Sequence, residues 1–251
     1  NGSSIVFAPH QDDETLGCGG TIIQKRRAGV PVWIVFMTDG SRSHKGLMGK
    51  EELKALRMLE ARNAGQVLGV PGEQIQYLQY PNGELKQYKR KAQEQVETLL
   101  TEIRPKEIFI PSPWDFHSEH RETAFIIMAA IARLKKKRLL GRIPLVYEYP
   151  VWFYYQWPLV RLPANNPAER SRLLKRGLRY GFGMAFLTQF RYAVSVCNVL
   201  DTKRDALAQY ASQTTRLNQG ADWATLQDVG GGEFIKFFFQ DCEVFRQVKV
   251  V

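Results

Sequence analysis

One stretch near the start of the chain constrains the fold most. An apolar run at residues 5–8 stops at His10 and continues into three consecutive acids at 12–14. A short apolar run that ends in polar residues before a helical pattern is typical of a buried parallel strand whose carboxyl end opens into a loop. In open α/β sheets, ligands bind in the crevice outside the carboxyl ends of the strands. The histidine and the acids are therefore either solvated loop residues or a metal site.

The same alternation of apolar runs and amphipathic helical patterns continues along the chain. Four further strands are expected, at residues 30–37, 75–78, 107–110 and 145–149. Successive strands joined by helices pair in parallel through right-handed crossovers. The pattern predicts an α/β fold of Rossmann-like type, with a mostly parallel sheet and helices on both faces.

Beyond Pro150 the alternation weakens. We expect strands at 192–199 and 233–239, and a helix at 202–217 with Asp201 as its N-cap. We therefore predict a single domain over residues 1–251. Its metal-binding α/β core would occupy 1–150, while 151–251 would complete the sheet and form a wall against the substrate.

Charge and cysteine content exclude several classes of protein. The formal net charge is +10, and much of the excess lies in residues 133–142 and 161–191. This allows attraction to anionic partners, but no nucleic-acid-binding module is recognisable, so no nucleic acid is expected. No apolar run approaches the ~18 residues of a membrane span. The three cysteines are scattered and fit reduced thiols, which favours a cytoplasmic protein, with membrane association left open.

Two predicted strand ends carry three of the four histidines. His10 follows the first strand with Asp13, and His120 follows the strand at 107–110. A catalytic zinc ion takes three ligands from such residues and leaves a position for water. Asp12 would be free to accept a proton from that water, and His117 could donate a proton or stabilise an oxyanion. Since His and carboxylate ligands also suit iron, the expected cofactor is Zn²⁺, with Fe²⁺ as the alternative.

The motifs resemble a known family. Residues 10–14 read His-Gln-Asp-Asp-Glu, 38–40 read Thr-Asp-Gly, and 117–120 read His-Ser-Glu-His. They are similar to the LmbE-like, or PIG-L, zinc-dependent N-deacetylases, whose usual motifs are Ala-His-Pro-Asp-Asp-Glu and His-Pro-Asp-His. The resemblance extends over residues 1–150 and includes the pattern Arg57-x-x-Glu60-Ala61.

The resemblance implies a role for each motif residue. It makes His10, Asp13 and His120 the metal ligands and Asp12 the general base. His117 becomes the residue that stabilises the oxyanion and helps to protonate the leaving amine. The implied reaction is hydrolysis of an acetamide on an amino sugar such as N-acetylglucosamine, in a glycoconjugate or a lipid-linked sugar.

Substrate contacts are implied less directly. Arg57 matches an arginine that contacts the substrate sugar or its phosphate in this family. Asn82 stands where many members have an aspartate that binds a sugar hydroxyl. Gln11 replaces the proline of the first motif. Asp115 and Phe116 occupy positions where some members place a carbonyl-polarising tyrosine, so that role has no residue here.

Four polar residues near the motifs have two interpretations each. Asp39 either holds a histidine ring in place or only caps a turn. Glu14 either caps the first helix or orients a metal ligand. Arg42 either reaches the substrate from the polar loop at 41–50 or is solvated. His44, in the same loop, is interpreted as a surface histidine.

The sequence is also compatible with two functions other than sugar deacetylation. Within enzymes, the alternative is an amidase acting on a non-sugar acetamide. Outside enzymes, an inactive module could bind a glycan or another polyanion through the basic surface. Residues Leu173, Leu174 and Leu178, flanked by arginine and lysine, predict either a core helix with a basic face or a helix that contacts an anionic membrane.

Overall fold

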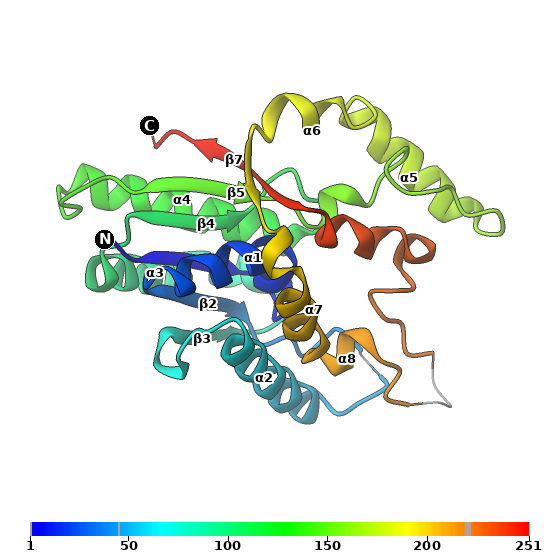
Figure 1. Cartoon of the computed structure of the whole chain (residues 1–251), viewed down its shortest axis with the longest axis horizontal. Coiled ribbons are helices and arrows are strands. Elements are labelled where there is room, and N and C mark those ends of the chain that lie inside the picture. Colours follow the sequence, from blue (N-terminus) through cyan, green and yellow to red (C-terminus); the bar gives the residue numbers. More distant parts are fainter. Residues whose placement is uncertain (1, 45, 219–221, 251) are drawn as a thin grey trace.

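The computed structural model describes residues 2–44, 46–218 and 222–250. One seven-stranded sheet runs through it in the order β3-β2-β1-β4-β5-β7-β6 (Figure 1). The first five strands are parallel, whereas β7 is antiparallel to both β5 and β6. The strands are β1 (Ser4–Ala8), β2 (Val32–Thr38), β3 (Ile75–Tyr80), β4 (Glu107–Pro111), β5 (Leu145–Tyr149), β6 (Tyr192–Ser195) and β7 (Cys242–Val248).

Helices cover both faces of this sheet. Helices α1, α2 and α7 pack together on one face, and α3 packs against α4 on the other. Helices α5 and α6 project beyond the sheet (Figure 1). The helices are α1 (Asp13–Arg27), α2 (Lys50–Val67), α3 (Lys89–Ile103), α4 (Ser118–Lys136), α5 (Pro167–Arg179), α6 (Met184–Gln189), α7 (Leu200–Ala208) and α8 (Ala211–Thr214).

The central strand β1 shows why the sheet is buried on both sides. Val6 and Ala8 pack into the core under α1 and α2, while Ile5 and Phe7 pack into the core under α3 and α4. Side chains alternate between the two faces of a strand, so a strand covered on both faces must be apolar throughout. The predicted Rossmann-like, mostly parallel sheet is confirmed.

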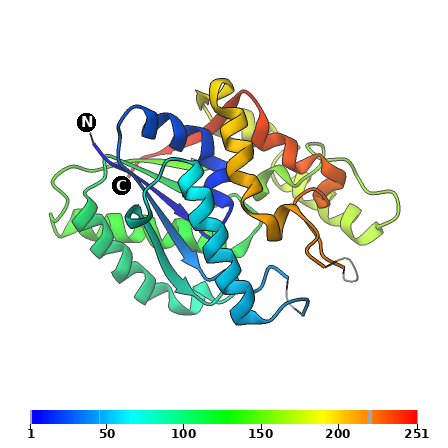
Figure 2. The ribbon, with the colours of Figure 1, turned by 60° about the horizontal axis from the view of Figure 1, so that its bottom comes forward.

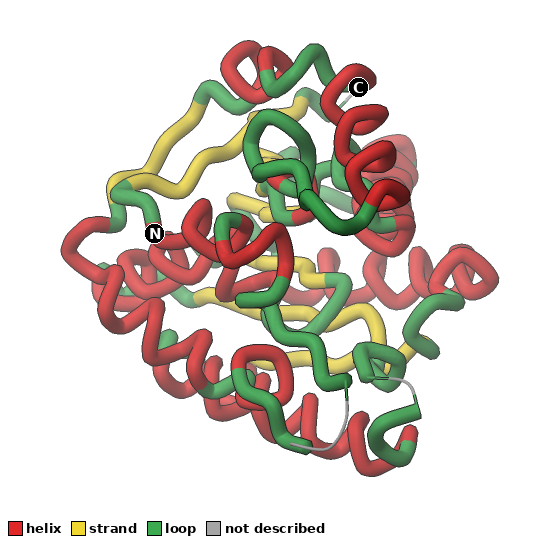
Figure 3. The backbone as a smooth tube through the Cα atoms, turned by 90° about the vertical axis from the view of Figure 1, so that its right-hand side faces the viewer, coloured by secondary structure: helices red, strands yellow, loops and turns green. Residues whose placement is uncertain are grey.

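The strand order places a crevice beside β1. Its neighbours β2 and β4 lead the chain in opposite directions across the sheet, so the order reverses between β1 and β4. In doubly wound sheets this switch point is where ligands bind. Figure 3 looks at the corresponding side of the molecule, where loops gather beyond the strands.

In the last hundred residues, the structure differs from a predicted strand. Residues 233–239 were expected as a strand, but Phe234–Phe239 is a 3-10 helix that buries Phe234 and Phe238. The strand lies later, at β7, where alternation is hidden because the inward-facing side chain next to Phe245 is Glu243. That carboxylate pairs with buried Lys203 at 2.7 Å.

Two helix boundaries also differ from expectation. The helix predicted at 202–217 is two helices, α7 and α8, because Tyr210 leaves the helical conformation between them. Asp201 lies inside α7 rather than at its N-cap. Helix α4 begins at Ser118, so the second motif forms the first turn of a helix. No helix among the described residues combines the length and apolar character needed to cross a bilayer.

Candidate active site

Three side chains from the two motifs converge at the switch point. His10 follows β1, Asp13 opens α1, and His120 lies in the first turn of α4. The His10 Nδ1 atom is 3.1 Å from Asp13 Oδ2, and the His120 Nε2 atom is 3.2 Å from the same oxygen. The structure therefore brings together the three residues predicted to bind metal, although they come from opposite sides of the crevice.

The outer nitrogen of each histidine meets a buried carboxylate. His10 Nε2 is 2.9 Å from Glu119 Oε2, and His120 Nδ1 is 2.8 Å from Asp115 Oδ2. A carboxylate only accepts hydrogen bonds, so each of these nitrogens carries the proton. In the neutral rings, the lone pairs of His10 Nδ1 and His120 Nε2 then face Asp13. Carboxylate–histidine pairs of this kind orient metal ligands.

The donor set fits a small divalent cation. His120 Nε2 is buried and makes no hydrogen bond among the described residues, although it lies within ion-pair distance of Asp13. Two imidazole nitrogens and one carboxylate oxygen are a usual set for catalytic zinc. His117 also lies close: one ligand atom from each of His10, His117 and His120 lies within 4.8 Å of the other two, so His117 is a further candidate ligand.

The charges of the site favour a cation. Burial opposes the charged form of both inward-facing histidines. Nevertheless, hydrogen bonds and charge interactions with Asp13 and the outer carboxylates raise the pKa of His10 to about 9 and that of His120 to about 10. The cluster thus holds positive charge on its histidines when no metal supplies it. A metal ion would take over that role as the histidines lose their protons.

Asp12 lies beside this cluster, where α1 begins. Its backbone φ of 123° is unusual for a residue other than glycine, and its N–H donates to Glu14 Oε2 at 3.1 Å. Residues held in such conformations often serve a functional site. Burial raises the pKa of Asp12 to about 7, against the opposing charge of Arg57, whose Nη2 is 3.3 Å from Oδ2. A base poised near neutrality suits proton abstraction from water.

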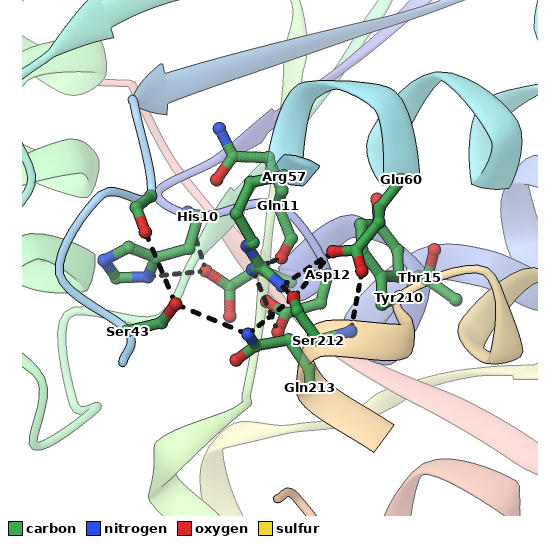
Figure 4. Close-up of polar contacts among 12 residues, drawn as sticks. His10, Gln11, Asp12, Thr15, Ser43, Arg57, Glu60, Tyr210, Ser212 and Gln213 are labelled. Carbon is green, nitrogen blue, oxygen red and sulfur yellow. Dashed lines mark hydrogen bonds and ion pairs between the residues drawn. The ribbon is translucent and has the colours of Figure 1, made fainter. Parts of the chain in front are cut away.

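Arg57 is buried and contacts the loop between β1 and α1. Its guanidinium donates to the backbone carbonyl of Gln11 and pairs with Asp12, as Figure 4 shows. On its other side it approaches Ser212 of α8 at 3.4 Å and Glu60 at 3.7 Å. Arg57, which was predicted to contact substrate, therefore makes most of its polar contacts within the protein.

Glu60 fastens the C-terminal part of the chain to this arginine. Its two oxygens accept from the backbone N–H and the hydroxyl of Ser212, at 2.6 and 2.7 Å. Glu14 of α1 has a similar role, since it accepts from the Tyr210 hydroxyl at 2.7 Å as well as from the Asp12 N–H at the start of α1. Glu14 thus caps α1 and anchors the junction between α7 and α8. Figure 2 shows α7 lying along α2 on this face.

Asp39 and Asn82 build the opposite rim. Asp39 Oδ1 accepts from the N–H and hydroxyl of Ser41 and from the Asn82 N–H, so it caps a turn, and none of these donors is a histidine. Asn82 donates to Glu119 at 2.7 Å and accepts from the Arg42 N–H at 3.0 Å. Asn82 therefore supports the residue that holds His10.

His44 is not a surface histidine. It is 6% exposed, its ring stacks on Trp223 at 4.0 Å, and its Nε2 is 2.8 Å from the Ala224 carbonyl oxygen. Trp223 in turn donates to the Ser212 carbonyl at 2.9 Å. Local sequence does not reveal this burial, because His44 and the Ala224 carbonyl are 180 positions apart.

These elements enclose a cavity of about 530 Å³. Residues of the two motifs form its floor, and a wall comes from the loop after β2 and from the C-terminal part of the chain. Among the lining residues are His10, Asp12, Asp13, Arg42, His44, Arg57, Asn82, His117, Glu119, Trp152, Gln213, Leu226 and Val229.

Comparison with known proteins identifies the family. The sequence model described as PIG-L, GlcNAc-PI de-N-acetylase, matches residues 5–131. The chain belongs to the PIG-L family. A diacetylchitobiose deacetylase of Thermococcus kodakarensis is 31% identical over 132 residues, which are 51% of this chain and 48% of that protein. The match therefore spans about half the length of this curated relative.

Solved structures share the fold at low identity. The N,N′-diacetylchitobiose deacetylase of Pyrococcus horikoshii has 20% identity and a TM-score of 0.70, covering 99% of this chain and 84% of that one. A deacetylase of teicoplanin biosynthesis has 15% identity and a TM-score of 0.66, with 98% and 97% covered. The 4-carboxy-2-hydroxymuconate hydratase of Pseudomonas putida has 16% identity and a TM-score of 0.65, with 99% and 97% covered. Because a hydratase shares it, the fold alone does not fix the reaction.

The motifs alone do not predict that two acids, Asp115 and Glu119, contact the histidines of the site. Asp115 accepts from the backbone N–H groups of Phe153 and Val151 as well as facing His120, and Glu119 accepts from the Gly83 N–H as well as facing His10. Both are acids inside or next to the second motif, and this position is the one sequence feature that could have pointed to them. Their partners are invisible in sequence, because burial beside a particular ring nitrogen is decided by packing.

Proposed function

We propose that this PIG-L protein is a metal-dependent N-deacetylase that hydrolyses the acetamide of an N-acetylated amino sugar. The observation that carries the proposal is the convergence of His10 Nδ1, Asp13 and His120 Nε2 beside the carboxylate of Asp12, which also lines the cavity. The family match and the deacetylase relatives support the same reaction class.

His10, Asp13 and His120 would hold the metal, with Zn²⁺ as the first candidate and Fe²⁺ as the second. Such an ion supplies Lewis acidity, which polarises a carbonyl and lowers the pKa of water. The remaining steps belong to the chain. Glu119 and Asp115 keep the two rings in the tautomer that presents a lone pair to the ion.

Asp12 is the proposed general base. It accepts a proton from the attacking water as the water oxygen forms a bond to the acetamide carbon. Arg57 fixes the orientation of this carboxylate through their ion pair and through the Gln11 carbonyl. When the carbon–nitrogen bond breaks, the proton on Asp12 is available to the departing amine, so the products are acetate and a free amine.

His117 is the proposed donor to the oxyanion. Its Nδ1 accepts from the Glu119 N–H at 3.3 Å, so the proton of the neutral ring is on Nε2. Burial, together with the nearby charges of His10 and His120, lowers the pKa of His117 to about 3. A neutral ring that donates through Nε2 favours hydrogen bonding to the oxyanion over protonation of the amine.

The substrate class rests on the cavity and on the relatives. A volume of about 530 Å³ is suited to a sugar-sized group. Trp152 and Leu226 offer apolar surface, while Arg42 and Gln213 offer polar groups at the rim. We assign Asn82 and Arg57 to support of the catalytic residues first and to substrate contact second, because most of their side-chain polar atoms already have protein partners.

An acetate-release screen tests the proposal. The purified protein would be incubated with N-acetylglucosamine, its oligomers and glycolipid forms, and with non-sugar acetamides, with and without a chelator. Asp12→Asn serves as the inactive control. Chelator-sensitive acetate release from a sugar is the expected result. Release only from non-sugar acetamides would move the enzyme to another amidase class, and chelator-insensitive release would overturn the metal-dependent mechanism.

A further inference from the structure

Apolar side chains are exposed on one projecting part of the molecule. We call residues 167–191 the basic hairpin; it consists of α5, the turn after it, and α6. Among the described residues, five of the twelve exposed large apolar side chains lie between positions 174 and 187. Leu178 is 69% exposed and Leu187 is 70% exposed. Clustered exposure of this kind marks an interaction site more often than isolated exposed residues do.

The basic hairpin is also strongly cationic. It contains six arginines and lysines and a single acid, Glu169. In α5, Arg170, Leu174 and Leu178 follow one another at helical spacing of four, and Lys175 lies beside that row. Leucines flanked by basic side chains on an exposed helix face are typical of helices that lie in a membrane interface.

The other face of the basic hairpin is anchored to the protein. Leu173 is buried in the core, and Gly177 lies against the Trp157 carbonyl so closely that a Cβ atom would be 2.1 Å from its oxygen. After α5, the Tyr180 ring contacts the rings of Trp114 and Phe116 at 5.6 and 5.2 Å. The exposed leucines therefore do not belong to the face of α5 that packs against the core, because Leu173 and Gly177 occupy that face.

We propose that the basic hairpin docks this protein peripherally on an anionic lipid bilayer. The exposed apolar side chains would enter the headgroup region, and the basic side chains would contact acidic headgroups. A second copy packed symmetrically on the same face would bring like charges together, because most of the basic side chains of the basic hairpin are exposed, and this disfavours a dimer there. A polyanion without a lipid phase would leave Leu178 and Leu187 in water.

The docked orientation has a consequence for the active site. Phe116, which Tyr180 contacts, directly precedes His117 on the cavity floor. Docking through the basic hairpin would therefore hold that side of the cavity near the bilayer. This inference concerns binding alone and does not depend on the deacetylase proposal.

Vesicle co-sedimentation tests the docking. The full chain would be mixed with vesicles of equimolar phosphatidylglycerol and phosphatidylcholine, and with vesicles of phosphatidylcholine alone. We expect binding to the acidic vesicles that falls steeply at about 0.5 M salt. Replacing Arg170, Arg172 and Lys175 by glutamine should lower the partition coefficient by about two orders of magnitude. Each basic side chain near the membrane surface raises this coefficient about fivefold, and the three effects multiply.

A matched pair of apolar variants distinguishes docking through the basic hairpin from nonspecific hydrophobic binding to lipid. The variant Leu178→Ser/Met184→Ser/Leu187→Ser should lose most of the binding, and its circular dichroism should be unchanged because these side chains are exposed. The control Leu59→Ser/Leu139→Ser removes equally exposed leucines elsewhere and should bind normally.

Three outcomes would overturn the docking proposal. One is the absence of salt-sensitive binding to acidic vesicles by the unaltered chain. Another is equal loss of binding in the control and in the hairpin variant. The third is a dimer in solution that the hairpin variant alone dissociates, which would assign this surface to a second copy of the chain.

Discussion

The floor and the wall of the cavity are held by different kinds of interaction. The floor, from the motifs at 10–14 and 115–120, is a set of buried charges in which each inward-facing histidine meets a carboxylate within about 3 Å. The wall, from the loop after β2 and from the segments 212–218 and 222–229, is held by ring stacking of His44 on Trp223 and by hydrogen bonds to backbone carbonyls.

We infer from this difference that the floor of the cavity determines the chemistry and the wall determines substrate selectivity. Buried charged groups have few geometries in which all of them are satisfied, so the floor is fixed and a change there leaves a charge without a partner. Stacked rings and single hydrogen bonds tolerate substitution better. Changes in the floor should therefore act on metal content and turnover, while changes in the wall should act on substrate affinity and stability.

The largest effect should come from His120→Ala. The substitution removes one of three proposed ligands, so the metal content of the purified protein should fall close to zero and acetate release should disappear. Elemental analysis measures the first and a kinetic assay the second. His44→Ala, which removes a histidine from the wall, is the control and should keep its metal. Full metal occupancy in His120→Ala would show that the ion is held by other residues.

Asp12→Asn should separate binding of the metal from turnover. The amide cannot accept the proton, so kcat should fall about 10²–10⁴-fold while metal content stays unchanged. Comparing kcat and metal content on the same preparation gives the answer. A variant that retains near-normal kcat would contradict the assignment of Asp12 as general base.

Asp115→Asn should weaken the floor without removing a ligand. The neutral amide holds the His120 ring less strongly and presents an N–H group where the carboxylate accepts from Phe153. Metal affinity should fall about 10–100-fold, as measured by competition with a chelator. Unchanged affinity would mean that packing alone orients His120.

The smallest effect should come from the wall. His44→Ala removes the stack on Trp223 and the contact with Ala224, which should lower the free energy of unfolding by about 1–2 kcal/mol. KM should rise severalfold while kcat stays within a factor of about three. Denaturant unfolding and steady-state kinetics provide the two measurements. A fall in kcat as large as that of Asp12→Asn would erase the distinction between floor and wall.

Most of the floor could be predicted from sequence, but its supports could not. The apolar runs that precede His10 and the motif at 117–120 mark two strand ends, and strand ends of a parallel sheet meet at one edge. The motif pattern points to Arg57, yet its ion pair with Asp12 depends on where α2 packs. The expected strand at 233–239 is a 3-10 helix, and strand β7 escapes prediction because Glu243, an inward-facing acid, disguises its alternation.

The sequence by itself determined the order of strands and helices over residues 1–150 and the edge of the sheet at which the histidines and acids lie. Those features follow from local periodicity, which is written in neighbouring residues. Only the tertiary structure decided which nitrogen of each histidine faces Asp13, which groups engage Arg57, and what forms the cavity wall. Most of these depend on contacts between segments more than about 100 residues apart, such as His44 with Ala224, and packing of whole elements decides such contacts.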